Sequence, residues 1–246
     1  MNISVIITYS KSSVDHENRW DGLKTTLECC RKQTFKDYEI ILAEHTRDGA
    51  KTYLPFRVDQ HLVIPYDGIF NKSWVSNVAA RVAKHDFILS LDADTIFGED
   101  YFQKISDYYE ETKNPFFNPW SKIECLTGRD EPTPRWIDAK DMKAAAHAWA
   151  FDKTFYWKIG GMNEKYFGYG AEDQDLWERA KHTLKSVPIM QYELKHVYHH
   201  FHPRESNFPL NEDRVRLLDD TKANLDKEIA RLIAMQDRLG RDKPCA

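Results

Sequence analysis

A pair of aspartates, Asp92 and Asp94, follows the apolar run Phe87 to Leu91 and is the first of three groups of residues in the sequence that could carry chemistry. Side chains alternate along an extended strand, so both carboxylates point the same way at its carboxyl end. Two converging carboxylates repel each other unless a cation lies close by. Oxygen ligands suit Mg²⁺ or Mn²⁺, and such an ion could bridge the oxygens of a diphosphate. The alternative is an acidic turn in which one aspartate caps the next helix.

A glycine-rich segment, Gly160 to Leu176, runs into a stretch that opens with the acids Glu172, Asp173 and Asp175. One of these acids could project into a crevice and take a proton from an attacking hydroxyl group. The alternative is ordinary helix-start chemistry, because acids are favoured in a first helical turn. Aromatic residues surround the segment in sequence, and aromatic faces suit sugar rings, although most aromatics at this density are core residues.

A histidine cluster lies in the segment Tyr198 to Glu205. His200 and His202 are two positions apart, so they face the same way in an extended chain. Clustered imidazoles suit Mn²⁺ and Zn²⁺, and the alternative is a surface histidine cluster. These three signals all point to one metal-assisted site.

The elements that must position these residues are predicted from four short apolar runs that do not alternate with polar residues. They are Ile3 to Thr8, Tyr38 to Ala43, Leu62 to Pro65 and Phe87 to Leu91. Such runs are typical of strands buried on both faces of a parallel sheet. Helical spacing between them predicts helices over Trp20 to Gln33 and Ser73 to Lys84, with Ser73 as the N-cap. The pattern predicts a doubly wound α/β sheet with its ligand crevice at the carboxyl ends of the strands.

This half of the chain suits a nucleotide but contains neither GxGxxG nor GxxxxGK. A glycine loop at a helix N-terminus therefore does not hold the phosphates, and another group must neutralise them. Further along, four prolines interrupt the stretch Asn114 to Trp149, which favours loops and short segments covering a site.

The tail from Asp213 to Gly240 is predicted to form one helix, in which leucines recur every seven residues at 218, 225, 232 and 239. Two of the four heptad a positions are polar. The helix is expected either to pack back onto the domain or to form a homodimer contact.

Composition excludes several classes of protein. The 246 residues are 41% hydrophobic and carry a formal net charge of −4 without a basic stripe, so no nucleic-acid partner is expected. The sequence contains no apolar run of transmembrane length, which favours a soluble, cytoplasmic protein. The four cysteines form no CxxC pair and fit reduced thiols better than a zinc site.

With these motifs in this order, the region Ile3 to Pro203 resembles the inverting GT-A glycosyltransferases. The resemblance is strongest to glycosyltransferase family 2 and to the carboxyl-terminal domain of the beta-1,4-galactosyltransferase type. It implies a mixed, mainly parallel GT-A sheet flanked by helices. It also implies a nucleotide-sugar donor, taken as a UDP-sugar, a Mn²⁺ or Mg²⁺ cofactor and a glycan or other hydroxyl acceptor. The implied organisation is a catalytic domain over residues 1–210, with a nucleotide-binding half (1–98) and an acceptor and metal half (99–210), and a helical extension over 211–246.

The resemblance also implies residue roles. Asp94 would bind the metal directly, and Asp92 would contact the ribose or act through the metal shell. The His-x-His segment supplies a further metal ligand, with His200 the first choice and His202 the second. Asp173 matches the family's catalytic base.

Glu172 matches a contact to the acceptor or donor sugar. The remaining positions implied to contact the nucleotide-sugar are Thr8 and Tyr9 after the first strand, Glu44 after the second, and Tyr169 and Gly170 in the sugar-site loop. Two departures concern that loop: Tyr169 stands where the galactosyltransferase pattern has Trp, and Ala171 stands for Gly.

Two other functions fit parts of the sequence. A catalytically silent nucleotide-sugar-binding protein would keep the same fold. A haloacid-dehalogenase-like phosphatase also uses an Asp-x-Asp pair after a strand, but that family wants Thr at the position of Ile96, and usually on its first strand.

Overall fold

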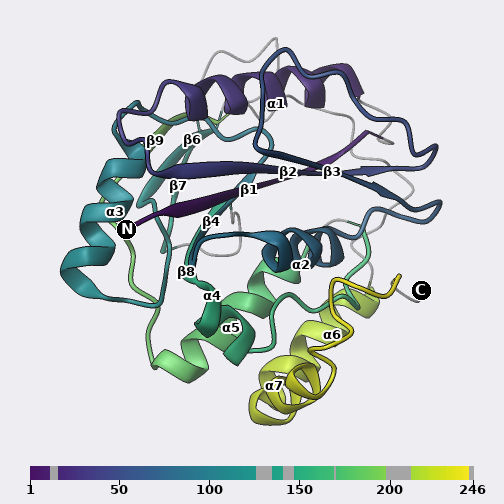
Figure 1. The fold of residues 1–246 in the computed structure, drawn as a ribbon. Helices are drawn as coiled ribbons and strands as arrows, with labels where there is room; N and C mark the ends of the chain where they lie inside the picture. The colour runs from purple at the N-terminus through teal and green to yellow at the C-terminus, as the bar shows by residue number, and fades with distance from the viewer. Residues whose placement is uncertain (12–15, 126–134, 141–146, 169, 198–211, 244–246) are drawn as a thin grey trace.

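The computed structural model describes residues 1–11, 16–125, 135–140, 147–168, 170–197 and 212–243. The main sheet has the strand order β3-β2-β1-β4-β8-β5 (Figure 1). Strands β1, β2, β3 and β4 run parallel, and β8 is antiparallel to both β4 and β5. This arrangement confirms the predicted mixed, mainly parallel α/β fold. The bounds are β1 Ile3–Ser10, β2 Tyr38–Thr46, β3 Gln60–Pro65, β4 Phe87–Asp92, β5 Phe116–Phe117 and β8 Ala148–Asp152.

Helices cover both faces of this sheet, with α1 and α2 on opposite sides (Figure 1). The bounds are α1 His16–Arg31, α2 Lys72–Val82, α3 Tyr101–Thr112, α4 Lys153–Lys158 and α5 Glu172–Leu184. In the ranges that the structure describes, no helix is both long enough and apolar enough to cross a membrane.

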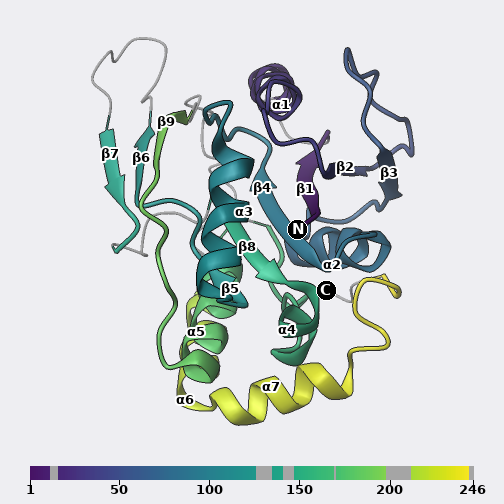
Figure 2. The same ribbon diagram turned by 60° about the vertical axis from the view of Figure 1, so that its left-hand side comes forward.

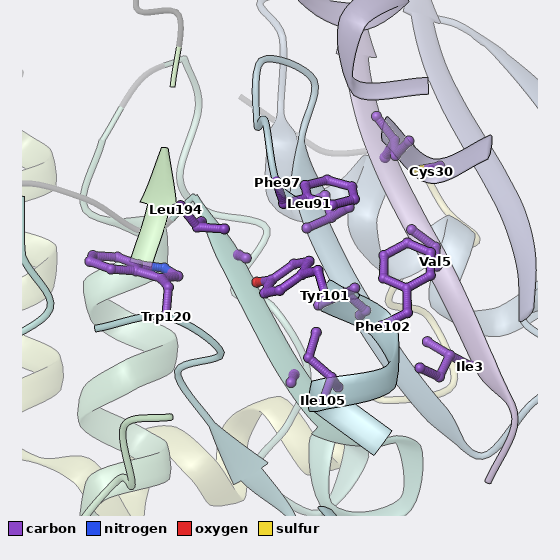
Figure 3. Close-up of a cluster of buried hydrophobic side chains, with 14 of the residues drawn as sticks. Ile3, Val5, Cys30, Leu91, Phe97, Tyr101, Phe102, Ile105, Trp120 and Leu194 are labelled. Carbon is purple, nitrogen blue, oxygen red and sulfur yellow. The ribbon is translucent and has the colours of Figure 1, made fainter. Parts of the chain in front are cut away.

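The core is divided between the two faces because successive side chains of a strand point in opposite directions. Val5 of β1 packs in one cluster with residues of α1 and α3, and Figure 3 shows it beside Cys30 and Phe102. Ile6, the next residue, belongs to a second cluster with residues of α2, α4 and α5. Burial on both faces explains why the strands appear in the sequence as continuous apolar runs.

The predicted N-cap of α2 is wrong by two residues. Asn71 caps the helix, and its side-chain oxygen accepts a hydrogen bond from the Trp74 N–H at 2.9 Å. Ser73 therefore lies inside the first turn. The shift matters because Lys72 becomes the first helical residue.

The segment Asn114 to Trp149, predicted as loops and short segments, contains the short strands β6 and β7, which pair with the later strand β9 in a second sheet of order β7-β6-β9 (Figure 2). Its strands are β6 Lys122–Cys125, β7 Arg135–Asp138 and β9 Glu193–Val197. Ile123 and Leu194 are buried in the first core cluster. These strands mix apolar with charged residues, so none of them stands out as an unbroken apolar run.

The predicted single C-terminal helix is wrong, because the chain breaks at Asn224 into α6 (Glu212–Ala223) and α7 (Leu225–Ala234). Both helices lie along the α5 side of the molecule (Figures 1 and 2). Leu232 is fully buried, and the Arg81 guanidinium of α2 donates to the carbonyl oxygens of Gln236 and Leu239. The expected packing onto the domain is therefore confirmed, while the homodimer stays a prediction.

Gly160 sets how closely α7 approaches the domain. Its φ is +90°, and a Cβ added there would lie 2.3 Å from the Leu232 Cβ. Gly160→Ala is expected to lower the free energy of unfolding by roughly 2–5 kcal/mol, from left-handed backbone strain together with overpacking. Gly49→Ala is the matched control, because Gly49 also has a positive φ but, among the described residues, its added Cβ would meet only Pro65, at 3.8 Å. Equal losses in denaturant unfolding of the two variants would contradict the prediction.

Candidate active site

The residues predicted at the strand ends lie at one edge of the sheet. Thr8 of β1 is in register with Asp92 of β4, and Tyr9 is in register with Glu44 of β2. Parallel strands bring their carboxyl ends together, so the sheet gathers these positions although up to 84 residues separate them in sequence.

Glu44 is fully buried, and its carboxylate is held by the protein itself. Its Oε2 accepts hydrogen bonds from the Thr52 N–H at 3.0 Å and from His61 Nε2 at 2.7 Å, and its Oε1 accepts from the Thr52 hydroxyl. Burial raises the pKa of Glu44, but these hydrogen bonds outweigh burial and lower it. The predicted contact of Glu44 with a nucleoside stays a prediction.

Asp92 and Asp94 converge as predicted, and a buried histidine joins them. Each of the residues Asp92, Asp94 and His147 offers one ligand atom, and these three atoms lie within 4.8 Å of one another. His147 directly precedes β8, which runs antiparallel to β4, so its carbonyl oxygen accepts the Asp92 N–H at 3.0 Å. Asp100, at the N-cap position, precedes α3, so the alternative in which Asp92 or Asp94 caps the next helix is wrong.

This cluster fits a divalent cation of the Mn²⁺ type. It combines two carboxylates with one imidazole, a donor set that suits this ion better than an all-thiolate or all-carbonyl site would. The three ligands found among the described residues leave coordination positions open for the oxygens of a bound phosphate group. The predicted metal ligands His200 and His202, and the predicted sugar contact Tyr169, lie outside the described residues.

The acids of the EDQD segment separate into two groups. Asp173 Oδ1 accepts a hydrogen bond from the Trp149 indole N–H at 3.2 Å, and its carboxylate remains partly exposed. Asp175 is fully buried and accepts two hydrogen bonds from Arg179, at 2.8 and 2.6 Å. Asp175 is therefore a structural residue, and Glu172 and Asp173 are the acids left for the site.

The loop that leads into α5 has left-handed backbone at its last two residues. Ala171, the residue before α5, has a φ of +73°, a left-handed conformation that is rare for a residue with a Cβ. Gly170 has a φ of +100°, and a Cβ added there would meet no atom of the described residues within 4 Å, so this predicted sugar contact borders open space in that part of the structure. Arg214 of α6 lies against Gly168, where an added Cβ would be 2.5 Å from its Nη2.

Lys72 links the two acidic groups. Its ammonium Nζ lies 2.7 Å from Asp92 Oδ1, 3.0 Å from Asp173 Oδ2 and 3.9 Å from Glu172 Oε1. Burial lowers the pKa of Lys72, but the neighbouring carboxylates, Asp173 first, outweigh burial and raise it well above its ordinary value. Lys72 is therefore a cation fixed between the candidate metal ligands and the candidate base.

Sequence reasoning did not single out Lys72, His147 or Arg214. Each is a single polar residue without a neighbouring motif, and His147 follows a stretch without a clear period. For Lys72 the sequence offered one signal. Asn71, directly before it, is a favoured N-cap residue, which would place Lys72 in the first turn of α2.

Glu172 is expected to make stability depend on pH. Burial and the charge of Asp173 raise its pKa from 4.5 to about 8, and the charge of Lys72 offsets only part of that rise. Between these two values the folded state holds a proton that the unfolded state releases, so stability is lost as pH rises through this window. Glu172→Gln removes the effect, and its melting temperature relative to wild type should therefore be higher at pH 8 than at pH 5.

The measurement is thermal unfolding without divalent ions or nucleotide, with Glu178→Gln on the same helix as the control. A difference between Glu172→Gln and wild type that does not change with pH would show that Glu172 is ionised throughout.

Comparison with known proteins gives matches of two kinds. The sequence profile described as glycosyl transferase family 2 matches residues 6–157, and the profile described as the N-terminal domain of galactosyltransferase matches residues 145–203. A search of the curated proteins gave no match.

Among solved structures, S. aureus TarS matches with a TM-score of 0.62 and 14% sequence identity, over 98% of this chain and 44% of TarS. TarS 1-349 in complex with UDP-GlcNAc matches with a TM-score of 0.58 and 14% identity, over 98% of this chain and 74% of that one. TarS 1-349 in complex with UDP gives a TM-score of 0.54 and 14% identity, over 98% and 73% of the two chains. The chain thus spans less than half the length of the first of these structures.

At this identity the solved structures establish the fold, which is the GT-A fold of glycosyltransferases. The mixed sheet and the carboxylates at the ends of its parallel strands agree with that class. The family 2 profile covers more than half of the residues, so the chain belongs to glycosyl transferase family 2.

Proposed function

We propose that this protein is a metal-dependent, inverting glycosyltransferase that moves a sugar from a nucleotide-sugar, a UDP-sugar, to a hydroxyl group of a glycan acceptor. One observation carries the proposal. The candidate metal ligands Asp92, Asp94 and His147 lie beside the candidate base Asp173, because Lys72 contacts Asp92 and Asp173 at the same time.

A uridine diphosphate donor is supported by two structural neighbours, which are TarS structures in complex with UDP-GlcNAc and with UDP. In this chain we assign Thr8, Tyr9 and Glu44 to the nucleoside side of the crevice, because they lie at the carboxyl ends of the parallel strands. Gly170 borders open space beside α5 and is assigned to the sugar.

Asp92, Asp94 and His147 would hold the divalent ion, and one further histidine ligand is retained as proposed, His200 as first choice and His202 as second. When bound, the ion would stabilise the negative charge of the departing diphosphate. Asp173 accepts the proton of the acceptor hydroxyl while the hydroxyl oxygen bonds to the anomeric carbon and the bond to the diphosphate breaks. A single displacement of this kind inverts the anomeric configuration. Trp149 holds the Asp173 carboxylate in orientation. Glu172, whose Oε1 lies 3.9 Å from Lys72 Nζ, is assigned to a contact with the acceptor or donor sugar.

The test is UDP release from UDP-sugars by the purified chain with Mn²⁺, with Mg²⁺ and with chelator. We expect release with Mn²⁺, and a loss of about 100-fold or more in Asp94→Ala, because mutating groups that stabilise transition-state charge costs factors of this order. Asp86→Ala is the control, because Asp86 is exposed at the opposite end of β4.

Full activity in a folded Asp94→Ala variant would contradict the metal assignment. A donor that binds with Mn²⁺ but is neither hydrolysed nor transferred would instead favour the non-catalytic binding protein.

A further inference from the structure

Lys72 shares a carboxylate with the candidate metal site. The Nζ of Lys72 contacts Asp92 Oδ1 at 2.7 Å, and Asp92 is also one of the three residues that could hold the ion. On its other side the same ammonium contacts Asp173 Oδ2 at 3.0 Å. The Lys72 ammonium therefore lies beside the position expected for the divalent ion, and both positive charges would contact Asp92.

The backbone on both sides of Lys72 is fixed by hydrogen bonds. Asn71 caps α2 and donates from its side-chain amide to the Glu164 carbonyl oxygen at 2.7 Å. The Gly168 N–H donates to the Phe70 carbonyl oxygen at 2.8 Å. These contacts join the start of α2 to the glycine-rich loop that precedes α5. The Lys72 side chain is only 16% exposed, so its ammonium is held at the acidic group.

A cation in hydrogen-bond contact with a carboxylate weakens the attraction of that carboxylate for another cation. Lys72 should therefore lower the affinity of the free protein for a divalent ion. A nucleoside diphosphate changes this balance, because its phosphate oxygens accept charge-assisted hydrogen bonds from an ammonium group. They also bring negative charge that offsets part of the charge of the ion.

We propose that Lys72 is a positioning residue that couples the two ligands, so that the divalent ion binds strongly only together with the nucleoside diphosphate. Without nucleotide, Lys72 acts as the counter-ion of Asp92 and Asp173. With nucleotide, its ammonium turns to the diphosphate and leaves Asp92 to the metal. The inference rests on the proposed function and adds an order of binding to it.

The experiment measures Mn²⁺ affinity by calorimetry or by the loss of the free-ion electron paramagnetic resonance signal, with and without saturating UDP. In Lys72→Met, Mn²⁺ affinity without UDP should rise roughly tenfold, because the competing charge is gone. With UDP present it should change by less than about threefold, since Lys72 no longer contacts Asp92 in that complex. The factor by which UDP strengthens Mn²⁺ binding should therefore shrink. By linkage, the factor by which Mn²⁺ strengthens UDP binding should shrink equally.

Lys72→Gln is a second neutral variant that keeps an N–H donor for Asp173, and it should change Mn²⁺ affinity in the same direction if Lys72→Met does not fold. Lys72→Arg keeps the charge and should remain close to wild type. Lys104→Met removes an exposed lysine of α3 and controls for net charge.

Mn²⁺ affinity without UDP that is unchanged or weaker in the neutral variants would overturn the proposal, because a merely structural lysine cannot strengthen metal binding when it is removed. Wild-type protein that binds no Mn²⁺ even with UDP would instead overturn the proposed metal dependence. The wild-type measurement therefore tests the function, and the variants test the role of Lys72.

Discussion

Asp173→Asn is expected to slow sugar transfer by about 10²–10⁴-fold, the usual contribution of a general base. An amide cannot take the proton of the acceptor hydroxyl, whereas it fills nearly the same volume and can still accept the Trp149 hydrogen bond. The affinity for the UDP-sugar should therefore stay within a few-fold of wild type. Initial rates of UDP release or transfer, measured beside donor affinity, separate the two effects.

Glu178→Gln is the matched control, because it removes one carboxylate from the same helix without a contact to the site among the described residues. A folded Asp173→Asn variant with wild-type turnover would exclude Asp173 as the base. Loss of donor affinity in proportion to rate would instead assign Asp173 to donor binding.

Arg179→Met is expected to lower the free energy of unfolding by about 3–5 kcal/mol, because it leaves the Asp175 carboxylate buried without its charge partner. Both side chains are fully buried. Arg179 also donates from Nη1 to the Ile159 carbonyl oxygen at 2.5 Å, and the Thr221 hydroxyl donates to Asp175 at 3.1 Å. The pair therefore joins α5 to the end of α4 and to α6.

The expected loss corresponds to roughly 6–20 °C in melting temperature for a chain of this size. Lys181→Met, an exposed change on the same helix, should leave stability within about 0.5 kcal/mol of wild type. The double variant Arg179→Met with Asp175→Leu should recover part of the loss, because replacing both charges removes the unpaired carboxylate. A single variant as stable as wild type would show that the pair contributes nothing to the fold.

The sheet could be predicted from the sequence because its strands are buried on both faces. Unbroken apolar runs such as Ile3 to Thr8 are a local signal, and each of the four predicted runs is a parallel strand of the main sheet. Two predictions made from equally local patterns were wrong: Ser73 as the N-cap of α2, and a single helix at the C-terminus. Asn71 competes with Ser73 as a cap, and the heptad pattern of the tail continues through Asn224 although the helix breaks there. The proposed division at residue 210 stays a prediction.

The acids of the candidate site show how far spacing alone can reach. Asp92 and Asp94 were predicted to converge because a strand alternates its side chains, and they do. Spacing could not choose between Glu172, Asp173 and Asp175, since all three lie in one helical turn. Their surroundings distinguish them. Arg179 forms a buried ion pair with Asp175, whereas Lys72 and Trp149 hold Asp173 in the site.

The sequence by itself determined the parallel α/β sheet and the two acidic motifs, because strand burial and side-chain alternation are properties of neighbouring residues. The resemblance carried by those motifs, in their order along the chain, indicated the family. Only the tertiary structure decided which groups surround those acids. His147 reaches Asp92 because β8 pairs antiparallel with β4, and Lys72 reaches Asp173 because α2 begins beside the glycine-rich loop. Such contacts join residues up to 101 positions apart, and they depend on how whole elements pack, which no local pattern in the sequence encodes.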